Sequence, residues 1–248
     1  MLNLIKVEFY KLKRSKSFYG MIILMLLQTL AVYTLSTHLK GMSGRKVLLD
    51  GFANEQFLLG MIIIAVFAGE YIGSEFYTGC IKNMISYGHS RKNIIIAKSI
   101  VFYIGVTIII SIYPIITTVI NSILYGYGEA FTFQSVINFI IITLLMMLVY
   151  VGIASIALAI AFISKNLIII IGVFMVVDPI VRVAEAMSLR NTTVNAIFSK
   201  TIYYQPSIIY RFNEVTIEQK LWTIIIALLT IAICTLISIY SFNRAEIK

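Results

Sequence analysis

Four ionisable residues stand in or beside long apolar stretches, where a charge is costly unless it has a partner or a function. Asp178, Arg182 and Glu185 are spaced i, i+4 and i+7, so a continuous helix places them on one face, where they can neutralise one another. Glu70 stands near the end of another apolar stretch and Glu75 just beyond it, and we expect these two to be interfacial carboxylates that meet Lys82 or Arg91. We favour a salt-bridged group for the first three, and a site that contacts substrate or ion is the alternative.

Patterns of nucleotide hydrolysis and metal catalysis are missing from the sequence. No stretch matches the phosphate-binding pattern G-x-x-x-x-G-K-[ST], and no Gly-Lys-Ser or Gly-Lys-Thr tripeptide occurs. The only histidines, His38 and His89, fall in polar segments rather than in a cluster of acidic residues. We therefore predict no catalytic residue, no metal site and no cofactor bound by this chain.

The composition is that of an integral membrane protein. Hydrophobic residues make up 60% of the 248 residues, charged residues make up 12%, and the mean hydropathy is +0.94. The net charge of +9 comes from basic residues in short segments between apolar runs, where they orient helices and do not indicate nucleic-acid binding. We expect one domain, 1–248, and no disulfide between Cys80 and Cys234.

Six apolar runs predict an all-α, polytopic fold. They cover residues 18–35, 57–72, 94–124, 134–163, 168–177 and 221–242. Pro114 in the third run predicts a kink. The fifth run has ten residues before Asp178-Pro179, too few to span a bilayer. Its helix either continues through the proline or breaks there and re-enters as a short helical hairpin.

The first residues, 1–17, predict an amphipathic helix that lies in the membrane interface. Its apolar residues recur at helical spacing, at Leu2, Ile5, Phe9 and Leu12. A signal peptide is the alternative, but no small-residue cleavage site follows. With the N-terminus inside, 12 Lys and Arg fall on the inner side and 8 on the outer side. This excess predicts both termini in the cytoplasm and the segment 182–220 outside.

A polar segment, 73–93, separates the second and third runs. Its apolar positions, Ile81, Met84 and Ile85, predict a short amphipathic helix, and Gly88 ends it. Ser90 stands where the N-cap of the third span belongs. A short helix between the cytoplasmic ends of two spans has the shape of a docking element, and a simple connecting loop is the alternative.

The same segment resembles the membrane subunits of ABC-2-type ATP-binding-cassette exporters. The pattern is E-x-x-x-G from Glu75, then Ser86, then H-S-R-K from His89, then an apolar stretch that ends in Ala97-Lys98. The order of a basic N-terminal helix, six spans and a large segment before the last span is also similar. The resemblance implies a permease that pairs with a second copy or a related permease. Two separate ATPase subunits, which hold the ATP and Mg²⁺, would drive it.

The resemblance also implies roles for particular residues. The segment 73–93 would be a coupling helix on the ATPase, with interface or transmission residues Glu75, Thr78, Gly79, Lys82, Ser86, Arg91 and Lys98. The helix at 1–17 would be an elbow helix, and the fifth span would break near Asp178-Pro179 into re-entrant outer helices. Soft apolar side chains of the second and fifth spans are the expected lining of a substrate cavity, namely Phe57, Met61, Phe67, Phe174 and Met175.

Small permeases of this kind are similar to exporters of amphipathic or antimicrobial peptides in the cell membrane of Gram-positive bacteria, including immunity permeases and phenol-soluble-modulin exporters. No substrate motif is present in the sequence. The alternative is an ATP-independent carrier or channel that uses Asp178, Arg182 and Glu70. Carriers often contain an internal repeat, and no similarity is found between residues 1–124 and 125–248. A membrane anchor without transport activity has the same hydropathy profile.

Overall fold

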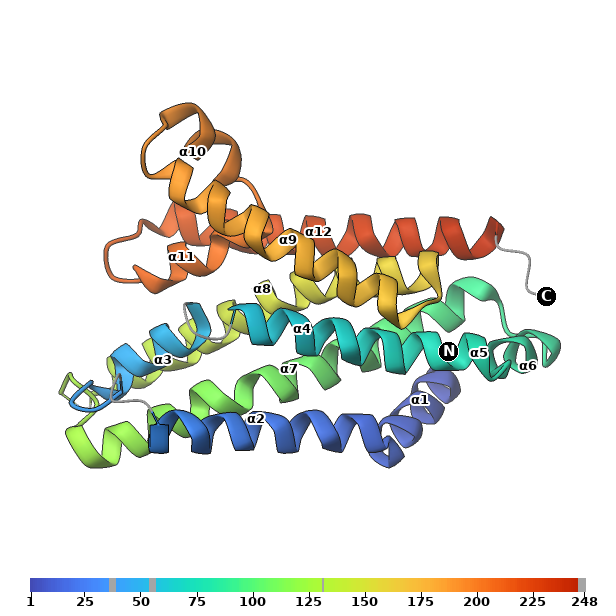
Figure 1. Cartoon of the computed structure of the whole chain (residues 1–248), viewed down its shortest axis with the longest axis horizontal. Helices are drawn as coiled ribbons and strands as arrows, with labels where there is room; N and C mark the ends of the chain where they lie inside the picture. The colour runs from blue at the N-terminus through green and yellow to red at the C-terminus, as the bar shows by residue number, and fades with distance from the viewer. Residues whose placement is uncertain (36–38, 54–56, 131, 245–248) are drawn as a thin grey trace.

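The chain forms an elongated bundle of long helices with short helices at both ends (Figure 1). The computed structural model describes residues 1–35, 39–53, 57–130 and 132–244, without the side chains of residues 57 and 58. His38 and the side chain of Phe57, both considered above, therefore lie outside the described residues. All elements within the described ranges are helical, which confirms the predicted all-α class.

Six helices are long and apolar enough to cross a membrane, as the sequence predicts. They are α2 (Lys16–Leu35), the run Leu59–Tyr77, α7 (Arg91–Tyr125), α8 (Phe133–Ser164), α9 (Leu167–Ser188) and α12 (Ile217–Arg244). The second of these joins α4 (Phe57–Ala68), the π-helix η1 (Gly69–Gly73) and α5 (Ser74–Tyr77) without a gap. The second span thus continues into the polar segment, as its short apolar run suggests. A π-turn inside such a helix often marks a functional position.

Side-chain caps fix the starts of the long helices. The hydroxyl of Ser90 accepts a hydrogen bond from the amide of Asn93 (3.3 Å), which confirms the predicted N-cap of α7. Thr132 and Ser135 form a reciprocal capping box at the start of α8. These caps set where α7 and α8 begin.

The fifth span does not break at Asp178-Pro179. Helix α9 continues through the proline to Ser188. A proline fits the helical φ and removes one backbone hydrogen bond. The carboxylate of Asp178 accepts from Arg182 Nε one turn later (2.9 Å), an ion pair that a continuous helix makes possible. Of the two alternatives the continuous helix holds, and the break that the resemblance implied is wrong. Re-entrance of the short helices that follow remains a prediction.

Short helices occupy the polar segments that the sequence left without structure. Helix α3 (Gly44–Ala53) packs on α7, with Val47, Leu48 and Phe52 fully buried. A Cβ on Gly51 would lie 3.2 Å from the Pro114 ring, so the two backbones approach closely there. After α9 come α10 (Thr192–Phe198), the 3-10 helix η2 (Ile202–Tyr204) and α11 (Gln205–Tyr210).

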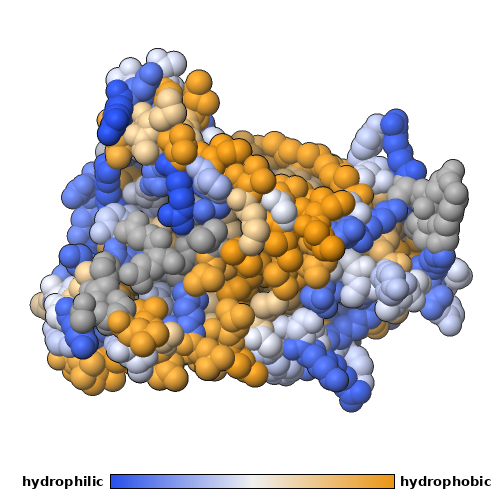
Figure 2. Space-filling view, in the orientation of Figure 1, coloured by the Kyte–Doolittle hydropathy of each residue, from blue (hydrophilic) through white to orange (hydrophobic). Residues whose placement is uncertain are grey.

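The two ends of the bundle differ. Helices α1 (Leu2–Arg14), α5 and α6 (Cys80–Ser86) lie at one end with the last turn of α12, and we name it the α5–α6 end (Figure 1). Helices α3, α10 and α11 lie at the other end, the α3 end. Hydrophobic residues cover the middle of the surface, and hydrophilic residues gather toward the ends (Figure 2). This is the distribution expected of helices that cross a bilayer.

Candidate functional site

Four charged side chains from three helices meet at the α5–α6 end. Lys98 Nζ on α7 lies 2.9 Å from Glu8 Oε2 on α1 and 2.5 Å from Glu75 Oε2 on α5. Lys11 Nζ, also on α1, lies 2.9 Å from Glu8 Oε1 and 2.9 Å from Glu75 Oε1. Two cations and two carboxylates thus form a closed, neutral group, which we name the charge cluster.

The charge cluster is buried. The side chain of Lys98 is 0% exposed and that of Glu8 is 1% exposed. Tyr71 of η1 donates its hydroxyl hydrogen to Glu8 Oε2 (2.8 Å), and its ring centroid lies 5.2 Å from Lys98 Nζ. Buried charges are tolerated when each has close partners, and removing one partner leaves the others uncompensated. The cluster therefore fixes α1, η1, α5 and α7 to one another.

The two members of the charge cluster on α1, Glu8 and Lys11, keep their charge across the physiological pH range. Burial alone would raise the pKa of the Glu8 carboxyl, but the ammonium groups of Lys98 and Lys11 outweigh burial and lower it below its ordinary value. Burial alone would lower the pKa of Lys11, but Glu75 and Glu8 raise it above its ordinary value. The stabilisation from Glu8 is lost as pH falls through its lowered pKa, and that from Lys11 as pH rises through its raised pKa.

Glu8 and Lys11 are the two members of the cluster that the sequence analysis missed. Glu8 lies one turn from Leu4 and one turn from Leu12, and all three are buried. Leu2, placed on the apolar face from the sequence, is 75% exposed. The face of α1 that packs on the bundle is thus rotated from the predicted one. The available signal was a lone acidic residue between leucines at i−4 and i+4 in an otherwise basic helix.

Phe76, next to Glu75, connects α5 to the other side of the bundle. Its ring centroid lies 6.1 Å from that of Phe162 on α8 and 5.9 Å from that of Phe242 on α12, both edge to face. The ammonium of Lys165 lies 5.2 Å from the centroid of the Phe76 ring. Successive residues of α5 thus contact α1 and α7 through charge, and α8 and α12 through aromatic packing.

The end surface next to these contacts is exposed and aromatic. Tyr77, which follows Phe76, is 96% exposed, and Tyr87 beyond α6 is 83% exposed. Between them, α6 attaches to the bundle through Ile81, which is buried. The remaining residues assigned to an interface lie on this surface, with Thr78, Lys82 and Ser86 exposed and Gly79 partly buried. Exposed aromatic side chains at one end of a bundle are typical of a protein contact.

The structure places four of the seven residues of the implied interface on this surface and the other three behind or beside it. Glu75 and Lys98 are buried in the charge cluster, so they lie behind the surface rather than on it. The guanidinium of Arg91 donates to the carbonyl oxygens of Phe242 (2.8 Å) and Asn243 (3.0 Å) at the end of α12. A pairing of Glu75 with Lys82 or Arg91, which the spacing suggested, is wrong, because Lys11 and Lys98 are its partners.

The charges predicted inside the membrane have local partners. Asp178 pairs with Arg182, as the i, i+4 spacing suggests. Glu185 instead accepts from the hydroxyl of Ser207 in α11 (2.9 Å). Glu70 accepts from the hydroxyl of Ser17 (3.2 Å) at the start of α2. The salt-bridged interpretation therefore holds for the first pair and does not extend to Glu185.

Of the expected substrate-contacting residues whose side chains the structure describes, three are buried in the core and one faces outward. Met61, Phe67 and Phe174 are buried in the hydrophobic core, and the Phe67 ring stacks on Phe102 with centroids 5.2 Å apart. Met175 points outward from α9 and is 55% exposed. A cavity lined by these residues would need the helices to rearrange or a second subunit to face α9.

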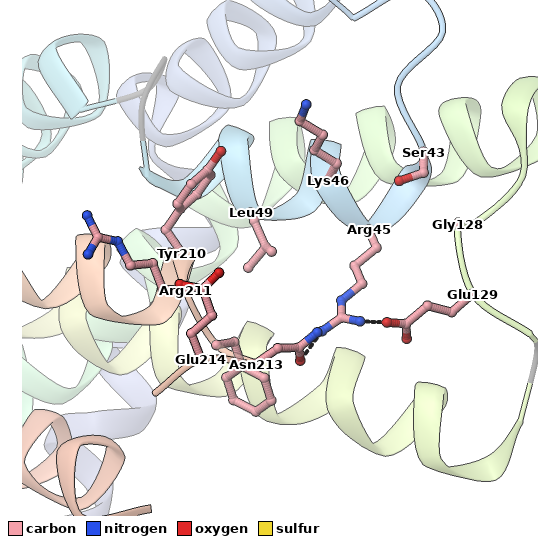
Figure 3. A pocket seen from close by; sticks show the side chains of 11 residues that line it. Ser43, Arg45, Lys46, Leu49, Gly128, Glu129, Tyr210, Arg211, Asn213 and Glu214 are labelled. Atoms are coloured by element: carbon pink, nitrogen blue, oxygen red, sulfur yellow. Dashed lines mark hydrogen bonds and ion pairs between the residues drawn. The ribbon is translucent and has the colours of Figure 1, made fainter. Parts of the chain in front are cut away.

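A polar cavity of about 300 Å³ opens at the α3 end (Figure 3). Arg45 of α3 forms an ion pair with Glu129, which precedes α8, and donates to the side chain of Asn213, which precedes α12. The amides of Gly44 and Arg45 donate to the carbonyl oxygens of Gly126 and Tyr127 (3.0 and 3.1 Å). Arg45 thus holds together three polar segments at the end opposite the charge cluster.

A comparison with family models found a match for this chain. Residues 4–178, which include α1, the charge cluster and α5 to α8, match the model of the ABC-2 family transporter proteins. A search of curated proteins found no match. The match covers well over half of the chain, and six helices long enough to span a membrane accompany it. The chain therefore belongs to the ABC-2 family of transporter proteins, a family of multi-pass membrane permeases that generally pair with an ABC ATPase.

Proposed function

We propose that the chain is the permease subunit of an ABC exporter and that separate ATPase subunits drive it through the α5–α6 end. The observation that carries the proposal is the arrangement of Glu75, Phe76 and Tyr77. These neighbours face the charge cluster, the α8–α12 contact and the exposed surface, respectively. A displacement of the surface at Tyr77 would be transmitted through direct contacts of its neighbours to α1, α7, α8 and α12.

In this proposal the α5–α6 end faces the cytoplasm, with both termini on that side. The excess of Lys and Arg in the inner segments supports this orientation. Helix α6 and the exposed tyrosines would enter a groove on the ATPase, and two ATPases would serve two permease subunits. ATP and Mg²⁺ would bind the ATPases. In the described part of the chain, no group of three or more metal-ligating residues is found.

The proposed cargo is a hydrophobic or amphipathic molecule, such as an amphipathic or antimicrobial peptide, that leaves the cell. The exposed face of α9 supports this, because Met175, Val176 and Ile180 are each more than half exposed. Methionine and β-branched side chains on a helix beside a second subunit would give an apolar and adaptable wall. Asp178 and Glu70 have local partners, so no described contact favours the carrier alternative.

The test is ATP-driven transport by the reconstituted complex. The tagged chain is co-expressed with an ABC ATPase from the same gene neighbourhood, and inside-out vesicles are supplied with a fluorescent amphipathic peptide. We expect the ATPase to co-purify with the chain and peptide uptake to require both the ATPase and MgATP. Uptake by the chain alone, driven by an ion gradient, would establish the carrier alternative and contradict the proposal.

A further inference from the structure

Helix α1 has a second face, opposite the one that packs on the bundle. Leu4, Glu8 and Leu12 are buried, whereas the other side carries exposed cations and exposed apolar residues. We name this side the basic face of α1, and it comprises Leu2, Lys6, Val7, Tyr10, Lys13 and Arg14. Within this chain, the described contacts of α1 are made by the buried side. The basic face therefore remains available to something outside the chain.

The position of α1 relates this face to the membrane boundary. Ser15, in extended conformation, separates α1 from α2, the first span, which begins at Lys16. The two helices consequently meet at an angle (Figure 1). Tyr10 and Tyr19, on either side of this bend, are 56% and 50% exposed. Exposed tyrosines near the start of a span are typical of the headgroup level of a bilayer.

Among the described residues, no acidic side chain pairs with the cations of the basic face. Glu8 is the only acidic residue of α1, and the charge cluster already holds it between Lys98 and Lys11. Lys6, Lys13 and Arg14 are exposed. The guanidinium of Arg14 lies over the ring of its neighbour Tyr10, 4.6 Å from the centroid, which holds this charge beside an apolar ring. A surface of this kind complements anionic headgroups with acyl chains beside them.

From this charge complementarity we infer that the basic face of α1 binds anionic phospholipid headgroups, through Lys6, Lys13 and Arg14. Leu2, Val7 and Tyr10 insert among the upper acyl carbons. The choice of the anionic cytoplasmic leaflet rests on the proposed function, which places the α5–α6 end in the cytoplasm. The opposite side of α1 carries Glu8 and Lys11, which pair with Lys98 and Glu75 in the charge cluster. Lipid composition therefore acts on a helix that is part of this cluster.

Lipid selectivity of the full-length chain in phosphatidylcholine nanodiscs tests the inference, with no ATPase present. Electron paramagnetic resonance compares the association of spin-labelled phosphatidylglycerol and spin-labelled phosphatidylcholine with the protein. The triple variant Lys6→Gln, Lys13→Gln, Arg14→Gln should lower the preference for phosphatidylglycerol at least about fivefold at low salt, the effect of roughly one lost cation-lipid contact. High salt should lower the preference of the unmodified chain in the same direction.

Two matched variants act as controls. Lys6→Arg, Lys13→Arg, Arg14→Lys keeps the charges and should keep the preference. Lys46→Gln, Arg190→Gln, Lys200→Gln removes three exposed cations elsewhere and should also keep it. No preference in the unmodified chain, or an unchanged preference in the first triple variant, overturns the inference. If the first triple variant keeps the lipid preference but no longer co-purifies with the co-expressed ATPase, the basic face binds the ATPase instead of lipid. Failure of ATP-driven transport would leave the lipid measurement unaffected.

Discussion

Replacing Lys98 with methionine is expected to lower the free energy of unfolding of the chain by roughly 3–5 kcal/mol. The substitution removes the side chain that contacts both carboxylates of the charge cluster and is itself 0% exposed. Glu8 and Glu75 then share only Lys11, which is one third exposed and partly screened by solvent. Denaturant titration of the purified chain in detergent, followed by circular dichroism, measures the loss.

Three comparisons make this prediction specific. Lys92→Met removes an exposed lysine six residues earlier on α7 and should change stability by no more than about 0.5 kcal/mol. Adding Glu8→Gln to Lys98→Met removes the excess negative charge and should restore part of the stability. Burial raises the pKa of Glu8, and without Lys98 this effect is opposed less. Glu8 is then protonated more readily, so the loss of stability in the Lys98 variant should become smaller as pH falls from neutral. Equal stability of the Lys98 and Lys92 variants would contradict a stabilising charge cluster.

Replacing Gly79 with proline is expected to lower ATP-driven transport at least about tenfold, a barrier increase of about 1.4 kcal/mol. Gly79 is the N-cap of α6 and has φ of +73°, in the left-handed region. Proline fixes φ near −65°, so the chain cannot turn from α5 into α6 as it does now. Peptide uptake by the vesicles described above measures the effect.

Asparagine at the same position separates backbone geometry from side-chain bulk. A Cβ at Gly79 would meet nothing within 4 Å, so there is room for a side chain. Asparagine tolerates the left-handed region better than other residues with a side chain, and Gly79→Asn should keep most of the transport activity. Both variants should elute from gel filtration like the unmodified chain. Full transport by Gly79→Pro would show that the turn from α5 into α6 is not needed to transmit the movement of the ATPase to the permease.

Apolar runs and turn residues were enough to predict the spans and the short helix between the second and third. Each long helix follows from about 20 apolar residues, since a backbone in lipid must satisfy its own hydrogen bonds. Ser90 at the start of α7 and Gly79 and Gly88 around α6 were also predicted correctly, because caps and left-handed turns depend on local residue types. These features need no knowledge of distant contacts.

Contacts between distant residues were not predictable in this way. Glu75 is 64 residues from Lys11 and pairs with it, whereas the spacing pointed to Lys82 or Arg91. Charge alone does not identify a partner when several cations lie near one end of the bundle. Only packing of α1 on α7, set by Leu4 and Leu12, brings Glu8 and Lys11 to the cluster.

Two helical segments could not be decided from local residue types. Pro179 left a break and a continuous helix open, and one lost backbone hydrogen bond did not end a helix that the Asp178–Arg182 pair also stabilises. The segment before the second span contains Arg45, Lys46 and Asp50, and its charge concealed a helix that buries Val47 and Phe52 on α7. Tertiary packing decides both cases.

The most direct test of energy transfer through the α5–α6 end uses Cys80. This residue is the first of α6 and its thiol is exposed, whereas Cys234, the other cysteine, is buried in α12. A maleimide-benzophenone label on Cys80 in the assembled complex is photoactivated, and the products are separated by gel electrophoresis and identified by mass spectrometry. The account predicts a crosslink to the ATPase subunit that Cys80→Ser abolishes. Active complexes in which the label reaches only lipid or water would contradict it.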